Sequence, residues 1–278
     1  MPTRQEKFDA FASLHAQEGC FVIANAWNAG SAKILEALGF KAIATTSAGL
    51  AFALGERDSS NRLDRETMLS NAKEIVEATS LPVSADLENG FAESPEDCAS
   101  IIGGAIAAGL VGCTIEDATG NSDKPIYDFE LAVDRIAACV EAGKGQNFFL
   151  TARAENYLHG RPDLDDTIRR LQAFDKAGAE VLYAPGLPNL AAIRAVCDSV
   201  HKPVNVVMGL SGPTWSVGEL AQAGVKRISV GGSFARAALG GLVRAAEEVL
   251  HSETFTYAGD ALPHAAATRF MAGKGDGG

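Results

Sequence analysis

The stretch "IAAGLVGCTIED", residues 106–117, joins the end of a helix to a short apolar run through Gly109. A glycine just past a helix adopts the left-handed conformation that closes the last turn, and a short apolar run after it is typical of a buried parallel strand. The same phrase recurs at 36–46 (EALGFKAIATT), 175–186 (DKAGAEVLYAPG) and 221–232 (AQAGVKRISVGG), with Gly39, Gly178 and Gly224 in the place of Gly109. Each phrase predicts a joint between a helix and a strand.

Further strands are expected between these joints, because the distance from one joint to the next leaves room for about two βα units. Apolar runs fill the gaps at 81–90 (LPVSADLENG), 147–156 (NFFLTARAEN) and 202–209 (KPVNVVMG), and another precedes the first joint at 20–27 (CFVIANAW). Eight strands are thus predicted, near 21–25, 41–46, 82–86, 111–116, 148–153, 180–184, 203–207 and 226–231. Helices are predicted to include 65–79, 95–108, 129–142, 163–177 and 233–250.

Eight βα units in succession predict an α/β fold of the (β/α)8 TIM-type barrel class, and an open doubly wound sheet is the alternative. No linker or low-complexity segment divides the chain, so we expect a single domain over 1–278. The barrel core should cover about 20–250. The segment 252–278 is then a C-terminal extension that packs on the barrel or on a neighbouring subunit.

Composition narrows the classes of partner. The net charge of -11 and the pI near 4.9 argue against binding to nucleic acid or to an acidic membrane, because both need clustered Lys and Arg. The five cysteines are widely spaced and form no CxxC pair, which favours reduced thiols in a cytoplasmic protein. With no apolar run typical of a signal peptide or a membrane span, a soluble protein is expected.

Polar residues gather where four neighbouring strands are predicted to end. Ser47 follows the second strand, Asp86 and Glu88 the third, Glu116 and Asp117 the fourth, and Arg153 and Glu155 the fifth. Active sites of such barrels lie at the carboxyl ends of the strands. Because side chains alternate along a strand, Asp86, Glu88, Glu116 and Arg153 should all point inward.

Carboxylates held this close would raise one another's pKa unless a cation neutralised them. Oxygen ligands without histidine or thiolate favour Mg²⁺ or Mn²⁺ over Zn²⁺. The alternative is that these acids cap helices or pair with Arg153, which is itself either a structural ion-pair partner or a clamp for a substrate carboxylate. The small residues of 45–51 (TTSAGLA) form either a backbone anion site or a plain loop. No lysine ends a strand, which argues against a Schiff-base aldolase.

With these residues in view, the chain resembles the isocitrate lyase/phosphoenolpyruvate mutase superfamily from about residue 20 to 250. Five segments carry the resemblance: the opening at 25–49 (NAWNAGSAKILEALGFKAIATTSAG), the acid loop at 55–60 (GERDSS), the metal motif at 84–91 (SADLENGF), and the strand ends at 114–117 (TIED) and 151–156 (TARAEN).

The resemblance implies a role for each matching residue. Asp86 looks like the direct Mg²⁺ ligand, and Asp58, Glu88 and Glu116 look like ligands acting through water. The expected substrate-binding residues are Trp27, Ser47, Ala48, Gly49 and Arg153, and the expected catalytic residues are Arg153, Asn121 and Glu116. Members of this kind stabilise a pyruvate enolate on the metal, act on small-molecule carboxylates, and form homodimers or homotetramers that exchange a C-terminal helix.

The loop after the fourth strand departs from the lyase pattern. Isocitrate and methylisocitrate lyases carry a K-K-C-G-H loop there, whereas residues 117–130 read DATGNSDKPIYDFE and contain no cysteine. Cys113 is no substitute, because alternation turns it toward the helices. Asn121 and Ser122 look like the "NS" of the phosphonate-processing mutases. We therefore predict a Mg²⁺-dependent carbon–carbon lyase, with phosphonate chemistry or a non-catalytic 2-oxo acid binder as alternatives.

Overall fold

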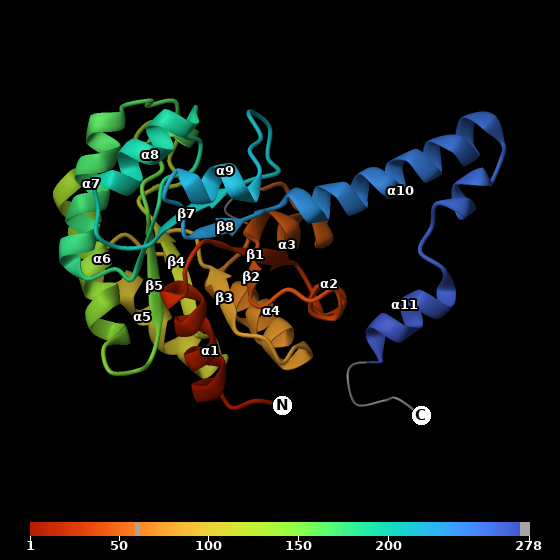
Figure 1. Cartoon of the computed structure of the whole chain (residues 1–278), viewed down its shortest axis with the longest axis horizontal. Helices are drawn as coiled ribbons and strands as arrows, with labels where there is room; N and C mark the ends of the chain where they lie inside the picture. Colours follow the sequence, from red (N-terminus) through yellow and green to blue (C-terminus); the bar gives the residue numbers. More distant parts are fainter. Residues whose placement is uncertain (59–61, 273–278) are drawn as a thin grey trace.

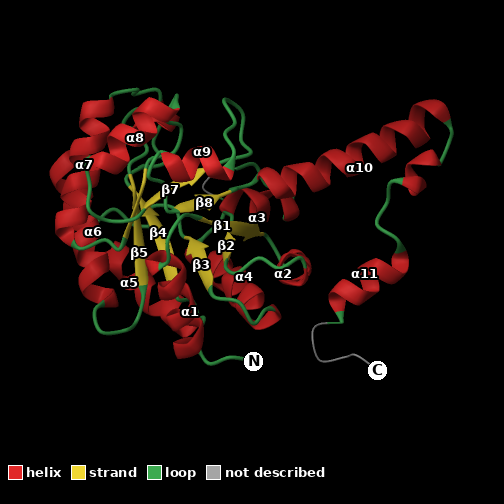
Figure 2. Ribbon diagram, viewed as in Figure 1, coloured by secondary structure: helices red, strands yellow, loops and turns green. Residues whose placement is uncertain are grey.

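The computed structural model describes residues 1–58 and 62–272. Its parallel strands pair in chain order and the last pairs with the first, so the sheet closes into a barrel (Figures 1 and 2). The strands are β1 (Phe21–Ala26), β2 (Ile43–Thr45), β3 (Val83–Asp86), β4 (Gly112–Glu116), β5 (Phe149–Arg153), β6 (Val181–Tyr183), β7 (Val204–Val207) and β8 (Arg227–Ser229). Each strand lies inside its predicted range or extends one residue beyond it, and the closed pairing confirms the barrel and excludes the open sheet.

Helices alternate with the strands and surround the barrel (Figure 2). They are α1 (Arg4–Ala16), α2 (Ala29–Ala37), α3 (Ser47–Ala53), α4 (Arg65–Ala78), α5 (Pro95–Ala107), α6 (Phe129–Gly143), α7 (Leu164–Ala177), α8 (Leu190–Asp198), α9 (Val217–Gln222), α10 (Ser233–Ser252) and α11 (His264–Met271), with 3-10 turns η1 (Asn156–His159) and η2 (Thr256–Gly259).

The joint glycines have the backbone conformation that the sequence predicts. The φ angles are 98° at Gly39, 87° at Gly109, 105° at Gly178 and 92° at Gly224. At Gly109, a Cβ atom would also lie 2.9 Å from Cγ1 of Val76. Conformation and space therefore both require glycine at this joint.

Two apolar layers hold the barrel together. Outward-facing strand residues such as Ala85, Cys113 and Ile115 are fully buried against the helices, so Cys113 does point away from the strand-end acids as alternation predicts. At the amino-terminal end of the strands, Phe11 of α1 packs with Phe21 and other buried residues. Helix α1 thus closes that end, and the opposite end carries the polar residues.

The C-terminal segment leaves the barrel. Helix α10 projects away from it, and the chain then turns back through η2 to α11 (Figure 1). Helix α11 contacts α2, where Lys33 Nζ donates to the Met271 carbonyl at 2.8 Å. Leu242, Val243 and Leu250 of α10 remain 65%, 52% and 73% exposed. Within residues 1–58 and 62–272, none of the helices combines the length and hydrophobicity of a membrane span.

Candidate active site

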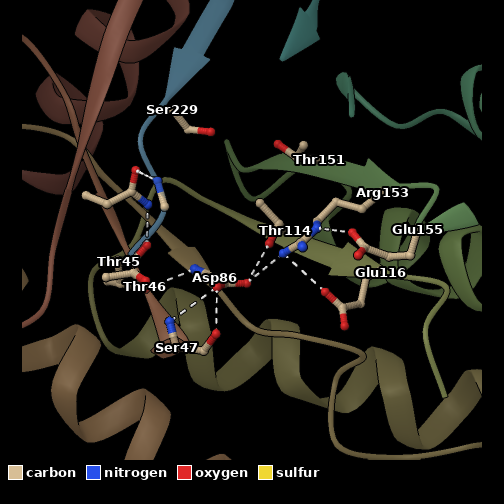
Figure 3. A network of polar contacts seen from close by, with 12 residues as sticks. Thr45, Thr46, Ser47, Asp86, Thr114, Glu116, Thr151, Arg153, Glu155 and Ser229 are labelled. Atoms are coloured by element: carbon tan, nitrogen blue, oxygen red, sulfur yellow. Dashed lines mark hydrogen bonds and ion pairs between the residues drawn. The ribbon is translucent and has the colours of Figure 1, made fainter. Parts of the chain in front are cut away.

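A cavity of about 200 Å³ opens at the carboxyl ends of the strands. Residues from most strands line it, including Ser47, Asp86, Thr114 and Arg153. Figure 3 shows the network of polar contacts that these side chains form with Glu116 and Glu155. The structure thus brings together the strand-end residues that the sequence analysis selected, on the face where barrel active sites lie.

Asp86 is held in place by donors from the neighbouring strand β4 and from α3. Its Oδ2 accepts hydrogen bonds from the Ser47 backbone N–H at 3.2 Å and from the Ser47 hydroxyl at 2.9 Å. Its Oδ1 accepts from the Thr114 hydroxyl at 3.3 Å. The carboxylate therefore has a fixed orientation at the end of β3.

Arg153 joins the acids of this site to one another (Figure 3). Its Nη1 lies 3.0 Å from Asp86 Oδ1 and 3.1 Å from Glu116 Oε2, and its Nε donates to Glu155 Oε1 at 2.8 Å. Burial alone would lower the pKa of Arg153, but the three carboxylates raise it well above its ordinary value. Arg153 therefore forms ion pairs with the site acids, as one of the two roles considered for it predicts. Its other role, binding a substrate carboxylate, stays a prediction.

The acids carry more negative charge than Arg153 neutralises. Burial, followed by the charges of Asp86 and Asp58, raises the pKa of Glu88 to about 7. Burial also raises the pKa of Glu116 well above its ordinary value, and Arg153 opposes this only in part. A cation bound beside these carboxylates would favour their ionised forms and oppose both shifts.

The donor set fits a hard divalent cation such as Mg²⁺. In the described part of the chain, no group of three or more acidic, histidine or cysteine side chains is placed so that it could hold a metal ion by itself. Mg²⁺ does not require one, because it keeps several water molecules and is commonly bound through one or two carboxylates. Asp86 as the direct ligand, with Glu88 and Glu116 behind water, satisfies this pattern.

The segment after β2 is a helix, so the expectation of a plain loop at 45–51 is wrong, and the anion-binding role of its backbone stays a prediction. Ser47, Ala48 and Gly49 form the first turn of α3, and Thr46 caps it by accepting a hydrogen bond from the Gly49 N–H at 3.3 Å. The N–H of Ser47 is already bonded to Asp86. Ser47 and Ala48 still line the cavity, so their predicted contact with substrate stays open.

Three predicted site residues lie at or beyond the edge of this network. Asp58 lines the cavity although it is exposed, and the neighbouring residues 59–61 lie outside the described part of the chain. Trp27 packs against Gly49, where an added Cβ would come within 2.9 Å of Trp27 Cβ. Asn121 is exposed in the loop after β4, where its Oδ1 accepts a hydrogen bond from the Asp123 N–H. Neither Trp27 nor Asn121 is among the described residues that line the cavity.

Glu155, which was expected at the end of β5, is 2% exposed: its Oε1 accepts from Arg153 Nε, and its own backbone N–H donates to Asp117 Oδ1. Three polar residues on another side of the site were not predicted. Asn205, Arg227 and Ser229 are buried polar residues in β7 and β8, and they line the deep part of the cavity. These polar residues stand at inward positions of strands that were predicted to be buried. Such positions are usually apolar, so the polar residues themselves were a signal in the sequence.

Comparison with known proteins supports the same assignment. Residues 11–250 match the family named phosphoenolpyruvate phosphomutase. The chain is 32% identical to 2-methylisocitrate lyase of Escherichia coli K12 over 227 residues, covering 78% of this chain and 75% of that protein. It is 51% identical to a crystal structure from Burkholderia cenocepacia J2315 named as a lyase/mutase, with a TM-score of 0.95 and 98% of each chain covered.

A more distant structure shares the fold. Phosphonopyruvate hydrolase, solved with oxalate and Mg²⁺, has a TM-score of 0.85 and 23% identity, with 97% of this chain and 95% of that chain covered. The extent of the family match and the identity to the lyase of E. coli confirm the resemblance predicted from the strand-end motifs. The chain belongs to the phosphoenolpyruvate phosphomutase family.

Proposed function

We propose that the protein is a Mg²⁺-dependent carbon–carbon lyase that acts on a 2-hydroxy or 2-oxo di- or tricarboxylate and releases pyruvate or a similar 2-oxo acid. The observation that carries the proposal is the gathering of Asp86 and Glu116 around Arg153 at the carboxyl ends of adjacent strands, with Glu88 close enough for the charge of Asp86 to raise its pKa. The identity to 2-methylisocitrate lyase supports carbon–carbon cleavage as the reaction type.

Each side chain has a part that follows from its position. Asp86 binds the cation, and Ser47 keeps the carboxylate of Asp86 oriented through two hydrogen bonds. A bound divalent cation stabilises the negative charge that develops on the enolate oxygen during cleavage. Arg153 would hold a substrate carboxylate through its guanidinium, whose Nε is fixed by Glu155; with a cation on Asp86, Nη1 would keep Glu116 as its carboxylate partner in the described part of the chain.

The loop after β4 decides which reaction follows enolate formation. It lacks the cysteine that the related lyases use as an acid, so another group or water delivers the proton. Asn121 is the residue whose resemblance to the phosphonate-processing mutases supports the alternative of phosphonate chemistry. It is exposed, and its hydrogen bonds stay within its own loop. The lyase reaction is therefore the proposal that the geometry supports best.

A substrate panel tests the proposal directly. Oxaloacetate, malate-type and citrate-type acids and phosphonopyruvate are incubated with and without Mg²⁺, and pyruvate release is measured. We expect Mg²⁺-dependent release from a carboxylic acid, inhibition by oxalate, and loss of turnover in Asp86→Ala. The matched control is Asp134→Ala, since Asp134 is exposed on α6. Turnover of phosphonopyruvate alone would establish phosphonate chemistry, and tight 2-oxo acid binding without any turnover would indicate a binding protein.

We also propose that the active form is a homodimer or homotetramer. Helix α10 projects from the barrel with Leu242, Val243 and Leu250 exposed on it. Exposed apolar residues gathered on one projecting helix indicate a protein contact. A second copy of the chain is the partner that the family resemblance implies.

A further inference from the structure

The barrel interior beneath the acids is polar. In most barrels of this class, branched apolar side chains fill the interior in layers. Here Asn205, Arg227 and Ser229 occupy inward positions of β7 and β8, and they are 1%, 3% and 9% exposed. Burying these polar side chains costs free energy of folding unless they form hydrogen bonds with one another or with a ligand.

Arg227 is only partly satisfied by its neighbours. Its Nε donates to Asn205 Oδ1 at 2.8 Å, and its Nη2 donates to the Thr151 hydroxyl at 2.9 Å. Its Nη1 is buried and has no hydrogen-bond partner among residues 1–58 and 62–272. Across the same residues, no carboxylate forms an ion pair with Arg227, in contrast to Arg153.

The positive charge of Arg227 persists despite this burial. Burial lowers the pKa of Arg227 to about 10, which still leaves the guanidinium protonated at neutral pH. A buried cation without a counter-charge is destabilising, and an anion that enters the site relieves the cost. A water molecule shared with the unpartnered Nε2 of His15 is the competing explanation.

The cavity connects Arg227 to the strand-end acids. Arg227, Asn205 and Ser229 line the same cavity as Asp86 and Arg153. Thr151, which Arg227 contacts, precedes Arg153 by two residues on the inward face of β5, a rise of about 7 Å. Figure 3 shows Thr151 and Ser229 beside the network of Arg153. One ligand can therefore reach from the acids to Arg227.

We propose that Arg227, Asn205 and Ser229 form a second carboxylate subsite at the floor of the cavity, and that the protein binds dicarboxylates whose far carboxylate lies there. The subsite rests on the proposed function, because the 2-oxo end of the ligand is held at the acids and the bound cation. It deepens that function by selecting four- to five-carbon dicarboxylates over monocarboxylates.

The test compares two 2-oxo acids of equal length. 2-Oxoglutarate carries the far carboxylate and 2-oxopentanoate does not, and calorimetry with Mg²⁺ measures both affinities. We expect wild-type protein to bind 2-oxoglutarate at least about tenfold more tightly, which is the usual effect of a charge-assisted hydrogen bond. In Arg227→Met the ratio should fall to about one, with 2-oxopentanoate affinity unchanged, and Arg227→Lys should retain part of the preference.

The matched control is Lys7→Met. Lys7 is another buried cation at the amino-terminal end of the barrel, but its Nζ donates to the carbonyls of Val76 and Thr79 and it lies outside the cavity. Lys7→Met should keep the preference for 2-oxoglutarate.

The possible results separate the subsite from the proposed function. Equal affinities in wild-type protein, or a preference that survives in folded Arg227→Met, would overturn the subsite and indicate that water satisfies Arg227. If neither acid binds when Mg²⁺ is present, the proposed function fails together with the subsite. Should Arg227→Met not fold, the wild-type ratio and that of Asn205→Ala decide, because Asn205 holds the Arg227 Nε.

Discussion

The buried imidazole of His15 makes the stability of the protein depend on pH. His15 stacks on Phe149 with ring centroids 4.8 Å apart, and its Nδ1 lies 2.9 Å from the Phe11 carbonyl. Burial, reinforced by the charge of Arg227 and opposed by the Phe11 carbonyl, lowers the pKa of His15 to about 3. The imidazole is therefore neutral in the folded protein and ionises near pH 6.5 in the unfolded chain.

The sign and size of the effect follow from these two pKa values. The unfolded chain binds the additional proton first as the pH falls, so the contribution of His15 is present above pH 6.5 and is lost progressively toward pH 3. Between pH 7 and pH 5 the loss is about 2 kcal/mol in the free energy of unfolding. His15→Phe keeps the aromatic packing without the titration.

Urea unfolding at pH 7 and pH 5 measures the effect in both proteins. The wild-type protein should lose about 2 kcal/mol more than His15→Phe over this interval, because all other titrating groups cancel in the comparison. An NMR titration of the ring gives the folded pKa independently. Equal losses in the two proteins, or a folded pKa near 6.5, would refute the assignment of His15 as a buried neutral group.

Three further outcomes are expected. Arg153→Met should lower the free energy of unfolding of the metal-free protein by about 3 kcal/mol, because the buried carboxylates lose their counter-charge. Chemical unfolding in EDTA measures this change, and a change under about 0.5 kcal/mol would contradict the prediction. Gly109→Ala should destabilise the folded protein by about 1 kcal/mol or more, because Gly109 has a φ of 87°. Gly103→Ala should stabilise it slightly, because Gly103 lies within α5 and an added Cβ meets no neighbour. Equal melting temperatures of the two variants would contradict this difference. Leu242→Asp should lower the mass seen by light scattering to that of one chain, and an unchanged mass would remove α10 from the subunit contact.

The fold was predictable because its signals are local. Each joint repeats the same local pattern of a helix end, a glycine and a short apolar run. The four joint glycines, Gly39, Gly109, Gly178 and Gly224, all have the expected positive φ. Helix α3 escaped prediction because it has seven residues, most of them small, and depends on Thr46 for its cap. The sequence of 47–53 is equally compatible with a loop.

The site was predictable in its location and less so in its contacts. Alternation placed Asp86, Glu116 and Arg153 on the inward face. The structure brings the carboxylates of Asp86 and Glu116 within 3.1 Å of Arg153 Nη1. Which acid Arg153 would contact could not be predicted, because this depends on the relative heights of three strands in the closed barrel. The interior polar residues carried a usable signal, since Arg227 interrupts a run that was predicted to be buried.

The proposed binding of Mg²⁺ by Asp86 is tested most directly by a calorimetric titration. Mg²⁺ is titrated into wild-type protein, Asp86→Ala and the surface control Asp134→Ala in the presence of oxalate, which resembles the enolate. Wild-type protein and Asp134→Ala should each bind Mg²⁺, and Asp86→Ala should give no binding heat while remaining folded. Equally tight Mg²⁺ binding by folded Asp86→Ala would contradict the assignment of this metal site.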